Sequence, residues 1–126
     1  MKNHKIKIAC VFSCPLYKKE IAKKTVEWSV KRLGLSKLKK LNILVKIKTL
    51  EGEDCDGYCE EISHKERKYN IVISDNQNLR DFVMTVIHEM IHVKQYVRKE
   101  WLIDGEPEAW GAQEILADEI WKDNIL

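Results

Sequence analysis

Residues 79–98 read LRDFVMTVIHEMIHVKQYVR and contain the strongest helical pattern in the chain. The apolar residues of this stretch recur at the three- and four-residue spacing of an α-helix and form one stripe: Leu79, Phe82, Val83, Val86, Met90, Val93 and Val97. Asn78 can cap the helix, and Asp81 stands in its first turn, where a negative charge is favoured. We therefore predict a helix from about residue 79 to about residue 98, with this stripe against the core.

Two histidines lie roughly opposite the stripe, in the pattern His88-Glu89-Met90-Ile91-His92. Residues four apart lie one above the other on a helix, so both imidazoles can reach one metal ion. Glu89 is about 100° around the helix from His88, where its carboxylate can act on a water without binding the metal. A chance pair of surface histidines is the alternative, because the pattern is short. The motif predicts zinc ligands at His88 and His92 and a general base at Glu89.

A third ligand is expected from the next helix. Catalytic zinc usually has three protein ligands, and the turn after the motif contains no further histidine. The proline at position 107 predicts a helix from about residue 107 to about residue 121. Its candidate carboxylates are Glu106, Glu108 and Glu114. Glu108 is preferred, because it shares a helical stripe with Ala112 and Ile115, whereas Glu106, the alternative ligand, is expected at the cap.

Two polar residues close to the motif are candidates for supporting roles. Gln95 lies near the His88 face, one heptad further on, where it can orient a metal ligand; a polar residue at the edge of the cleft is an equal alternative. Tyr96 is two turns beyond His88 and is a candidate donor to a reacting oxyanion. Packing is the competing explanation for Tyr96, because a half-buried tyrosine usually serves that purpose.

The rest of the chain alternates strand-like and helix-like patterns. We predict strands at residues 6–12, 41–49, 57–62 and 68–74, the last two forming a hairpin. A helix is predicted over residues 17–34, ending at Gly34. This order predicts one α+β domain over residues 1–126, with a mixed or antiparallel sheet of about four strands packed with an N-terminal helix, the His-Glu-x-x-His helix and a C-terminal helix.

Charge is distributed unevenly along the chain. Residues 1–50 carry 14 Lys and Arg and 2 acids, a net charge of +12, whereas residues 51–126 carry a net charge of −10. Such asymmetry can indicate a surface for nucleic acid. The alternative, which we favour, is a solvated basic helix packed near the acidic half of the same domain. If DNA binds, the residues expected to hold it are Lys23, Lys24, Lys31 and Arg32.

The four cysteines form two pairs, Cys10 with Cys14 and Cys55 with Cys59. We expect Cys10 to be a small apolar residue of its strand, because disulfides are rare in the cytosol. A second metal site built from all four cysteines is the alternative. The N-terminus has no signal-peptide pattern, and no stretch reaches the roughly 20 apolar residues of a membrane span. The default expectation is a cytoplasmic protein without membrane contact.

Two segments of the chain resemble a known family. His88-Glu89-Met90-Ile91-His92-Val93-Lys94-Gln95, followed by Glu106-Pro107-Glu108-Ala109, is similar to SprT-like (Spartan-type) zinc metallopeptidases, above all to the small stand-alone versions encoded by tailed phages. The resemblance covers about residues 55–116 well and the basic half only in element order. It implies a zincin-like fold, Zn²⁺ as cofactor and Glu108 as the third ligand. The chain departs from the pattern in having no zinc-ribbon segment and in placing Pro107 between the two glutamates.

The resulting hypothesis is a zinc metallopeptidase that hydrolyses protein or peptide substrates, in the host cytoplasm if it is phage-encoded. Strand 68–74, or its hairpin partner, is expected to hold the substrate backbone by strand addition. Because Spartan-type enzymes cleave proteins crosslinked to DNA, the resemblance also implies possible DNA contact through the basic N-terminal half. The alternatives are a zinc-fold binding protein that cuts nothing, against which Glu89 argues, and a nucleic-acid binding protein with a structural metal. The oligomeric state stays open.

Overall fold

The computed structural model describes residues 3–10, 14–50, 56–100 and 106–123. Its elements in chain order are β1 (Asn3–Cys10), α1 (Leu16–Arg32), the short 3₁₀ helix η1 (Leu35–Lys37), β2 (Lys40–Lys48), β3 (Gly57–Ser63), β4 (Lys68–Ser74), α2 (Leu79–Arg98) and α3 (Glu106–Lys122). Apart from η1, this is the predicted order of elements.

The four strands form one mixed sheet in the order β1-β2-β4-β3. β1 pairs with β2 in parallel, and β2 pairs with β4 in parallel. β3 and β4 are the predicted antiparallel hairpin, with Tyr58 opposite Val72 and Cys59 opposite Ile71. The mixed α+β class and the four-stranded sheet predicted from the sequence are therefore confirmed. β4 lies inside the sheet, and β1 and β3 are the two edge strands of the sheet.

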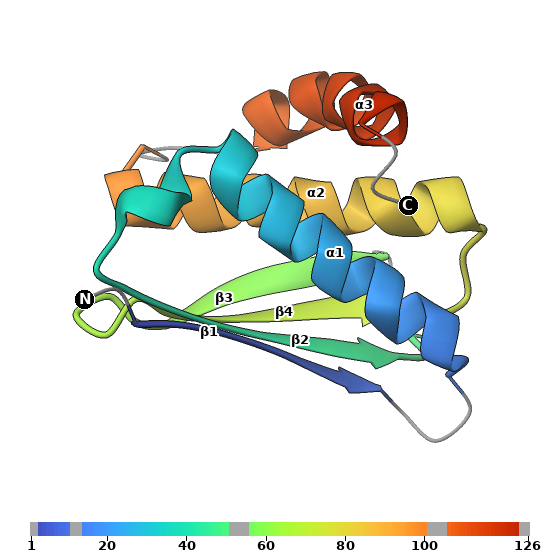
Figure 1. Ribbon diagram of the computed structural model, residues 1–126, viewed down its shortest axis with the longest axis horizontal. Coiled ribbons are helices and arrows are strands. Elements are labelled where there is room, and N and C mark those ends of the chain that lie inside the picture. Colours follow the sequence, from blue (N-terminus) through green and yellow to red (C-terminus); the bar gives the residue numbers. More distant parts are fainter. Residues whose placement is uncertain (1–2, 11–13, 51–55, 101–105, 124–126) are drawn as a thin grey trace.

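The helices lie on one side of the sheet in two layers (Figure 1). α1 and α2 pack directly on the sheet, and α3 packs on α2 on the side away from the sheet. One apolar cluster fills the space between the sheet and the first helix layer, and it includes Val86 and Met90 of α2. A second cluster includes Ile87 and Ile91 of α2 together with Ala117 of α3. α2 is therefore buried on two sides, which holds its histidines in fixed positions.

Local signals in the sequence account for the helix ends. The Asn78 side chain accepts a hydrogen bond of 2.9 Å from the backbone N–H of Asp81, so the predicted cap of α2 is present. α1 ends at Arg32, and Gly34 follows with a φ of 75°. A left-handed conformation is easy for glycine because it has no Cβ, and this explains the predicted stop.

The cysteines differ from what the sequence predicted. Cys10 and Cys14 are joined by a disulfide, so Cys10 is not a free apolar residue of its strand. Cys59 is a free thiol on β3, and Cys55 lies outside the described residues, as do residues 11 and 12 of the first predicted strand. Within the described residues, no helix combines the length and the apolar character needed to span a membrane.

Candidate metal centre

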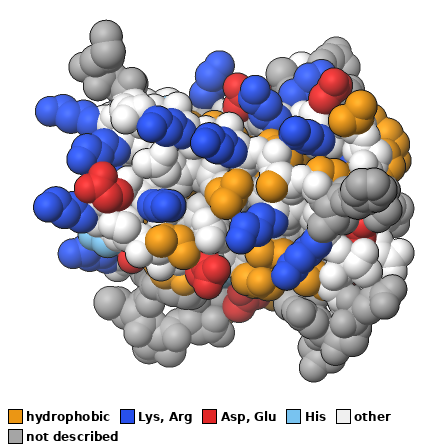
Figure 2. Space-filling model, turned by 90° about the horizontal axis from the view of Figure 1, so that it is seen from below, with side chains coloured by type: hydrophobic (Ala, Val, Ile, Leu, Met, Phe, Trp, Pro, Cys, Tyr) orange, Lys and Arg blue, Asp and Glu red, His pale blue; other side chains and the backbone are white. Residues whose placement is uncertain are grey.

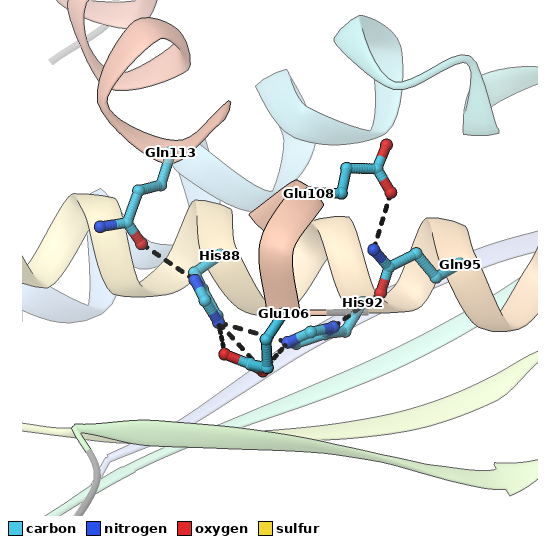
Figure 3. Close-up of polar contacts among 6 residues, drawn as sticks. All are labelled: His88, His92, Gln95, Glu106, Glu108 and Gln113. Carbon is cyan, nitrogen blue, oxygen red and sulfur yellow. Dashed lines mark hydrogen bonds and ion pairs between the residues drawn. The ribbon is translucent and has the colours of Figure 1, made fainter. Parts of the chain in front are cut away.

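The two histidines of α2 and one glutamate of α3 meet at a single point (Figure 3). His88 and His92 are 7% and 6% exposed, and their Nε2 atoms are 3.2 Å apart. Glu106 places Oε1 2.7 Å from His92 Nε2 and Oε2 3.2 Å from His88 Nε2. The ligand atoms all lie within 4.8 Å of one another, so the three side chains could hold a metal ion.

The chemistry of these three groups fits a zinc ion. Two imidazole nitrogens and one carboxylate oxygen form a ligand set found in catalytic zinc sites. Tetrahedral zinc with bonds of 2.0–2.1 Å requires ligand atoms about 3.3 Å apart, close to the 3.2 Å that separates the two Nε2 atoms. A cation placed between the two nitrogens and the carboxylate would be attracted by all three groups.

Two glutamines orient the imidazole rings of the histidines. The Nδ1 atom of His92 lies 2.8 Å from Gln95 Oε1, and the Nδ1 atom of His88 lies 2.9 Å from Gln113 Oε1. An amide oxygen only accepts hydrogen bonds, so Nδ1 is the donor in each pair and Nε2 is the nitrogen that faces the candidate metal position. The orientation of the Gln95 amide is fixed in turn, because its Nε2 donates to Glu108 Oε1 at 2.7 Å and a carboxylate can only accept.

Glu108, the preferred third ligand in the sequence, occupies a different position. Its carboxylate accepts hydrogen bonds from Lys94 and Gln95 rather than facing the two imidazoles. The Lys94 ammonium, followed by the Gln95 amide, holds the pKa of Glu108 below its usual value. The structure thus corrects the choice between the two carboxylates: Glu106, the alternative, lies at the histidines, and Glu108 supports His92 through Gln95.

The reason for this difference is the rotation of α3. The expected stripe ran through Glu108 and Ile115, but Ile115 is 61% exposed. The buried residues of α3 are instead Ala109, Leu116, Ala117 and Ile120. α3 also begins at Glu106 itself, so this residue belongs to the first turn rather than preceding the helix. Glu106, Trp110 and Gln113 follow one another at spacings of four and three, which places them on one face.

Glu89, the predicted general base, is buried beside the candidate metal site. Its side chain belongs to a residue only 4% exposed, and it lines the same pocket as the histidines and Glu106. Burial, and secondarily the nearby charge of Glu106, raises the pKa of Glu89 to about 8. A divalent cation at the triad would favour the charged carboxylate and lower this pKa. The residue is therefore placed where the charge of a metal would control its protonation.

A pocket of about 660 Å³ opens in front of these residues. Its walls come from α2, α3 and the start of β3, including Tyr58, Cys59, Met84, Trp110 and Gln113. Trp110 is 63% exposed, and its ring centroid is 4.9 Å from that of His88. β3 reaches this wall through Gly57, where an added Cβ would lie only 2.8 Å from Thr85 Cγ2 and from the Val72 carbonyl oxygen. An apolar surface is thus available beside the candidate metal site.

Three further residues considered in the sequence, Tyr96, Glu114 and Cys59, lie outside the group that could hold a metal. Tyr96 stacks on Tyr69, with ring centroids 6.0 Å apart, and packs against the core cluster of the sheet. Glu114 is exposed on α3. Burial, followed by the charge of Glu89, raises the pKa of the Cys59 thiol well above its usual value, which favours the protonated form rather than a metal-binding thiolate. Among the described residues, no cysteine belongs to the group that could hold a metal.

Gln113 and Trp110 are the site residues that the sequence reasoning missed. Both could have been found from the spacing, since they follow Glu106 by seven and four residues. The spacing was overlooked because the predicted rotation of the helix placed Glu108, rather than Glu106, toward the histidines. In comparisons with known proteins, no family model, curated protein or solved structure matches the chain.

Proposed function

We propose that this protein is a zinc-dependent metallopeptidase of the SprT-like type. The observation that carries the proposal is the convergence of His88 Nε2, His92 Nε2 and the Glu106 carboxylate beside a buried glutamate, at the wall of an open pocket. In this proposal Glu106 replaces Glu108 as the third zinc ligand. Three protein ligands leave one position for water or substrate, which is the usual arrangement of a catalytic zinc site.

Zinc, when bound, supplies a water of lowered pKa and polarises a substrate carbonyl. Side chains of the protein transfer the protons and hold the metal ligands in position. Glu89 accepts the proton of the attacking water on its carboxylate and later returns it to the leaving amine. The Gln95 and Gln113 amide oxygens hold the two imidazoles in the ligating tautomer throughout. Trp110 contacts the His88 ring edge-on and helps to hold it in place.

The substrate backbone is proposed to bind along β3 by strand addition. β4 pairs with β2 on one side and β3 on the other, so it has no edge to offer, and the expectation that strand 68–74 itself could bind substrate is wrong. β3 pairs with β4 alone among the described strands, and Tyr58 and Cys59 at its start line the pocket. An extended peptide on this edge would pass the candidate metal site with backbone hydrogen bonds and little sequence preference.

The test compares wild-type protein with Glu89→Gln on an unfolded protein substrate, with zinc content measured on the same samples. Glu89 is not a metal ligand here, so the variant should keep its zinc and its fold. It should lose about 10²- to 10⁴-fold in cleavage rate, because an amide cannot accept the proton. Equal cleavage by both proteins would exclude Glu89 as the base. Zinc-loaded wild-type protein that cleaves nothing would favour the zinc-fold binding protein instead.

A further inference from the structure

Strand register gathers lysines on the face of the sheet that is turned away from the helices. Lys5 of β1 is the register partner of Asn42, and Asn42 is that of Lys68. Residues in register point to the same face, as do residues two apart along a strand. Six outward lysines of β1, β2 and β4 follow from this rule, and we call them the lysine face: Lys5, Lys7, Lys40, Lys46, Lys48 and Lys68. Figure 2 shows Lys and Arg side chains spread across this side of the molecule.

The charges of the lysine face are largely uncompensated within the described residues. Lys40 forms an ion pair with Glu66 at 3.5 Å, and both side chains are more than half exposed, so this pair is weak. No described acidic residue forms an ion pair with the other five lysines. The outward residues of β3 include one acid, Glu60, in register with Asn70 at the margin of the face. The positive charge is therefore available to a partner.

Two basic residues of α1, Lys18 and Arg32, are engaged within the molecule, whereas Lys23, Lys24 and Lys31 are exposed. Arg32 donates to Glu119 at 2.7 Å, and this carboxylate raises the pKa of its guanidinium further. Lys18 donates to the backbone oxygen of Asp75 at 2.5 Å. Five of the six residues of the lysine face belong to residues 1–50, so the basic surplus of this half is shared between the sheet and α1.

The dimensions of the lysine face suit a duplex. From Lys40 to Lys48, β2 extends about 26 Å at roughly 3.3 Å per residue, which matches about eight base-pair steps of 3.4 Å. Among the described outward residues, Tyr58 is the one aromatic side chain, and it lies on β3 at the margin. Stacking with unpaired bases needs several such rings. Among the described strands, the exposed large apolar residues that could enter a bilayer are Tyr58 and Ile62, both on β3.

We propose that the lysine face binds double-stranded nucleic acid through its phosphates, without reading base sequence. This proposal does not rest on the peptidase function, because the face lies on the side of the sheet opposite α2. Both surfaces can therefore be occupied at once. Binding of this kind depends on counterion release, and its affinity falls as salt rises, by a slope of about 0.9 per phosphate neutralised.

The test measures binding of the full chain to a fluorescent DNA duplex of about 20 base pairs by anisotropy. With four or five phosphates neutralised, affinity should fall about 100- to 500-fold between 50 and 200 mM salt. The face variant replaces four lysines by glutamine: Lys5, Lys7, Lys46 and Lys68. It should lose at least about tenfold in affinity at the lower salt and most of the salt slope.

A matched variant carries the same change in net charge on α1, by glutamine at Lys19, Lys23, Lys24 and Lys31. It should bind within about threefold of wild type, and the circular dichroism of all three proteins should agree. Equal loss in both variants would overturn the proposal, because overall charge rather than the lysine face would then hold the duplex. Absence of binding at the lower salt would overturn it too, as would tighter binding to anionic phospholipid vesicles than to the duplex. A DNA duplex of unrelated sequence and an RNA duplex that bind equally well would support recognition of phosphates alone.

Discussion

Glu106 and Glu108 have different partners although they are equally exposed and lie in the same turn of α3. Each carboxylate side chain is 46% exposed, and both belong to the first turn of α3. Glu106 reaches the two imidazole Nε2 atoms, whereas Glu108 reaches the Gln95 amide and the Lys94 ammonium. The two residues are therefore a natural matched pair for separating a ligand from a residue that positions a ligand.

Glutamine substitution at these two positions should have unequal effects on zinc. Glu106→Gln should weaken zinc binding by more than about 100-fold, beyond the 10- to 100-fold typical of groups that support a ligand. Glu108→Gln should cost no more than about tenfold, because the new amide oxygen can still accept from Gln95. Competition with a chromophoric chelator measures both. The reverse order would return the ligand role to Glu108.

The two histidines of the candidate metal centre could be predicted from the sequence, whereas the position of the carboxylate could not. The spacing of His88 and His92 is set by a single helix, so the geometry is local and readable. The third carboxylate depends on how α3 is rotated against α2, and this is decided by packing between residues far apart in sequence. Ala112 and Ile115 suggested one rotation, but the buried Ala109, Leu116 and Ile120 impose another.

At the scale of the elements, the close approach of β3 to α2 shapes the pocket. Gly57 permits it, since an added Cβ would lie 2.8 Å from Thr85 Cγ2 of α2 and 2.8 Å from the Val72 backbone oxygen of β4, which the sheet holds in place. Gly111 on α3 is the matched control, because nothing lies within 4 Å of a Cβ added there. A side chain is therefore excluded by close contacts at Gly57 but has free space at Gly111.

Alanine at these positions should change stability in opposite directions. Gly57→Ala should lower the free energy of unfolding by about 1–3 kcal/mol through overpacking. Gly111→Ala should raise it by about 0.5–1 kcal/mol, because alanine is the better helix former. Urea unfolding followed by circular dichroism measures both. A neutral result for Gly57→Ala would mean that β3 does not pack against α2 in this way.

Elements with strong local patterns were predicted well. The Asn78 cap, the β3–β4 hairpin and the buried part of the α2 stripe follow from short-range rules and are present. Leu79, which was predicted to belong to the stripe, is instead 40% exposed at the start of the helix. Strand order could not be predicted in the same way. It depends on β4 inserting between β2 and β3, which places strands distant in sequence side by side. The Cys10–Cys14 disulfide was likewise missed, because the reasoning began from an assumed compartment rather than from distance.

At the scale of the whole molecule, a bound metal would fasten α3 to α2. Glu106 comes from the first turn of α3, and the histidines come from the middle of α2. The apolar cluster that joins the two helices includes several small residues, among them Ala109 and Ala117. Zinc would therefore add a link between two layers that are otherwise held by packing and surface ion pairs such as Arg80 with Asp118.

Zinc should accordingly stabilise the native protein. At a free zinc concentration 100 times the dissociation constant, the free energy of unfolding should rise by about 2.7 kcal/mol. Thermal unfolding with and without zinc measures the gain. The His88→Ala and His92→Ala variants should show none of it. A gain that survives either substitution would place the stabilising metal elsewhere, for instance on cysteines.

We expect one zinc ion to be held by His88, His92 and Glu106, with one coordination position left open. X-ray absorption spectroscopy of protein loaded with one equivalent of zinc tests this most directly. The predicted spectrum has two imidazole nitrogens and light oxygen scatterers near 2.0–2.2 Å, with no sulfur at about 2.3 Å. Glu106→Gln should change the oxygen shell while leaving the imidazole scattering in place. A sulfur shell, or a spectrum without imidazole, would contradict the account.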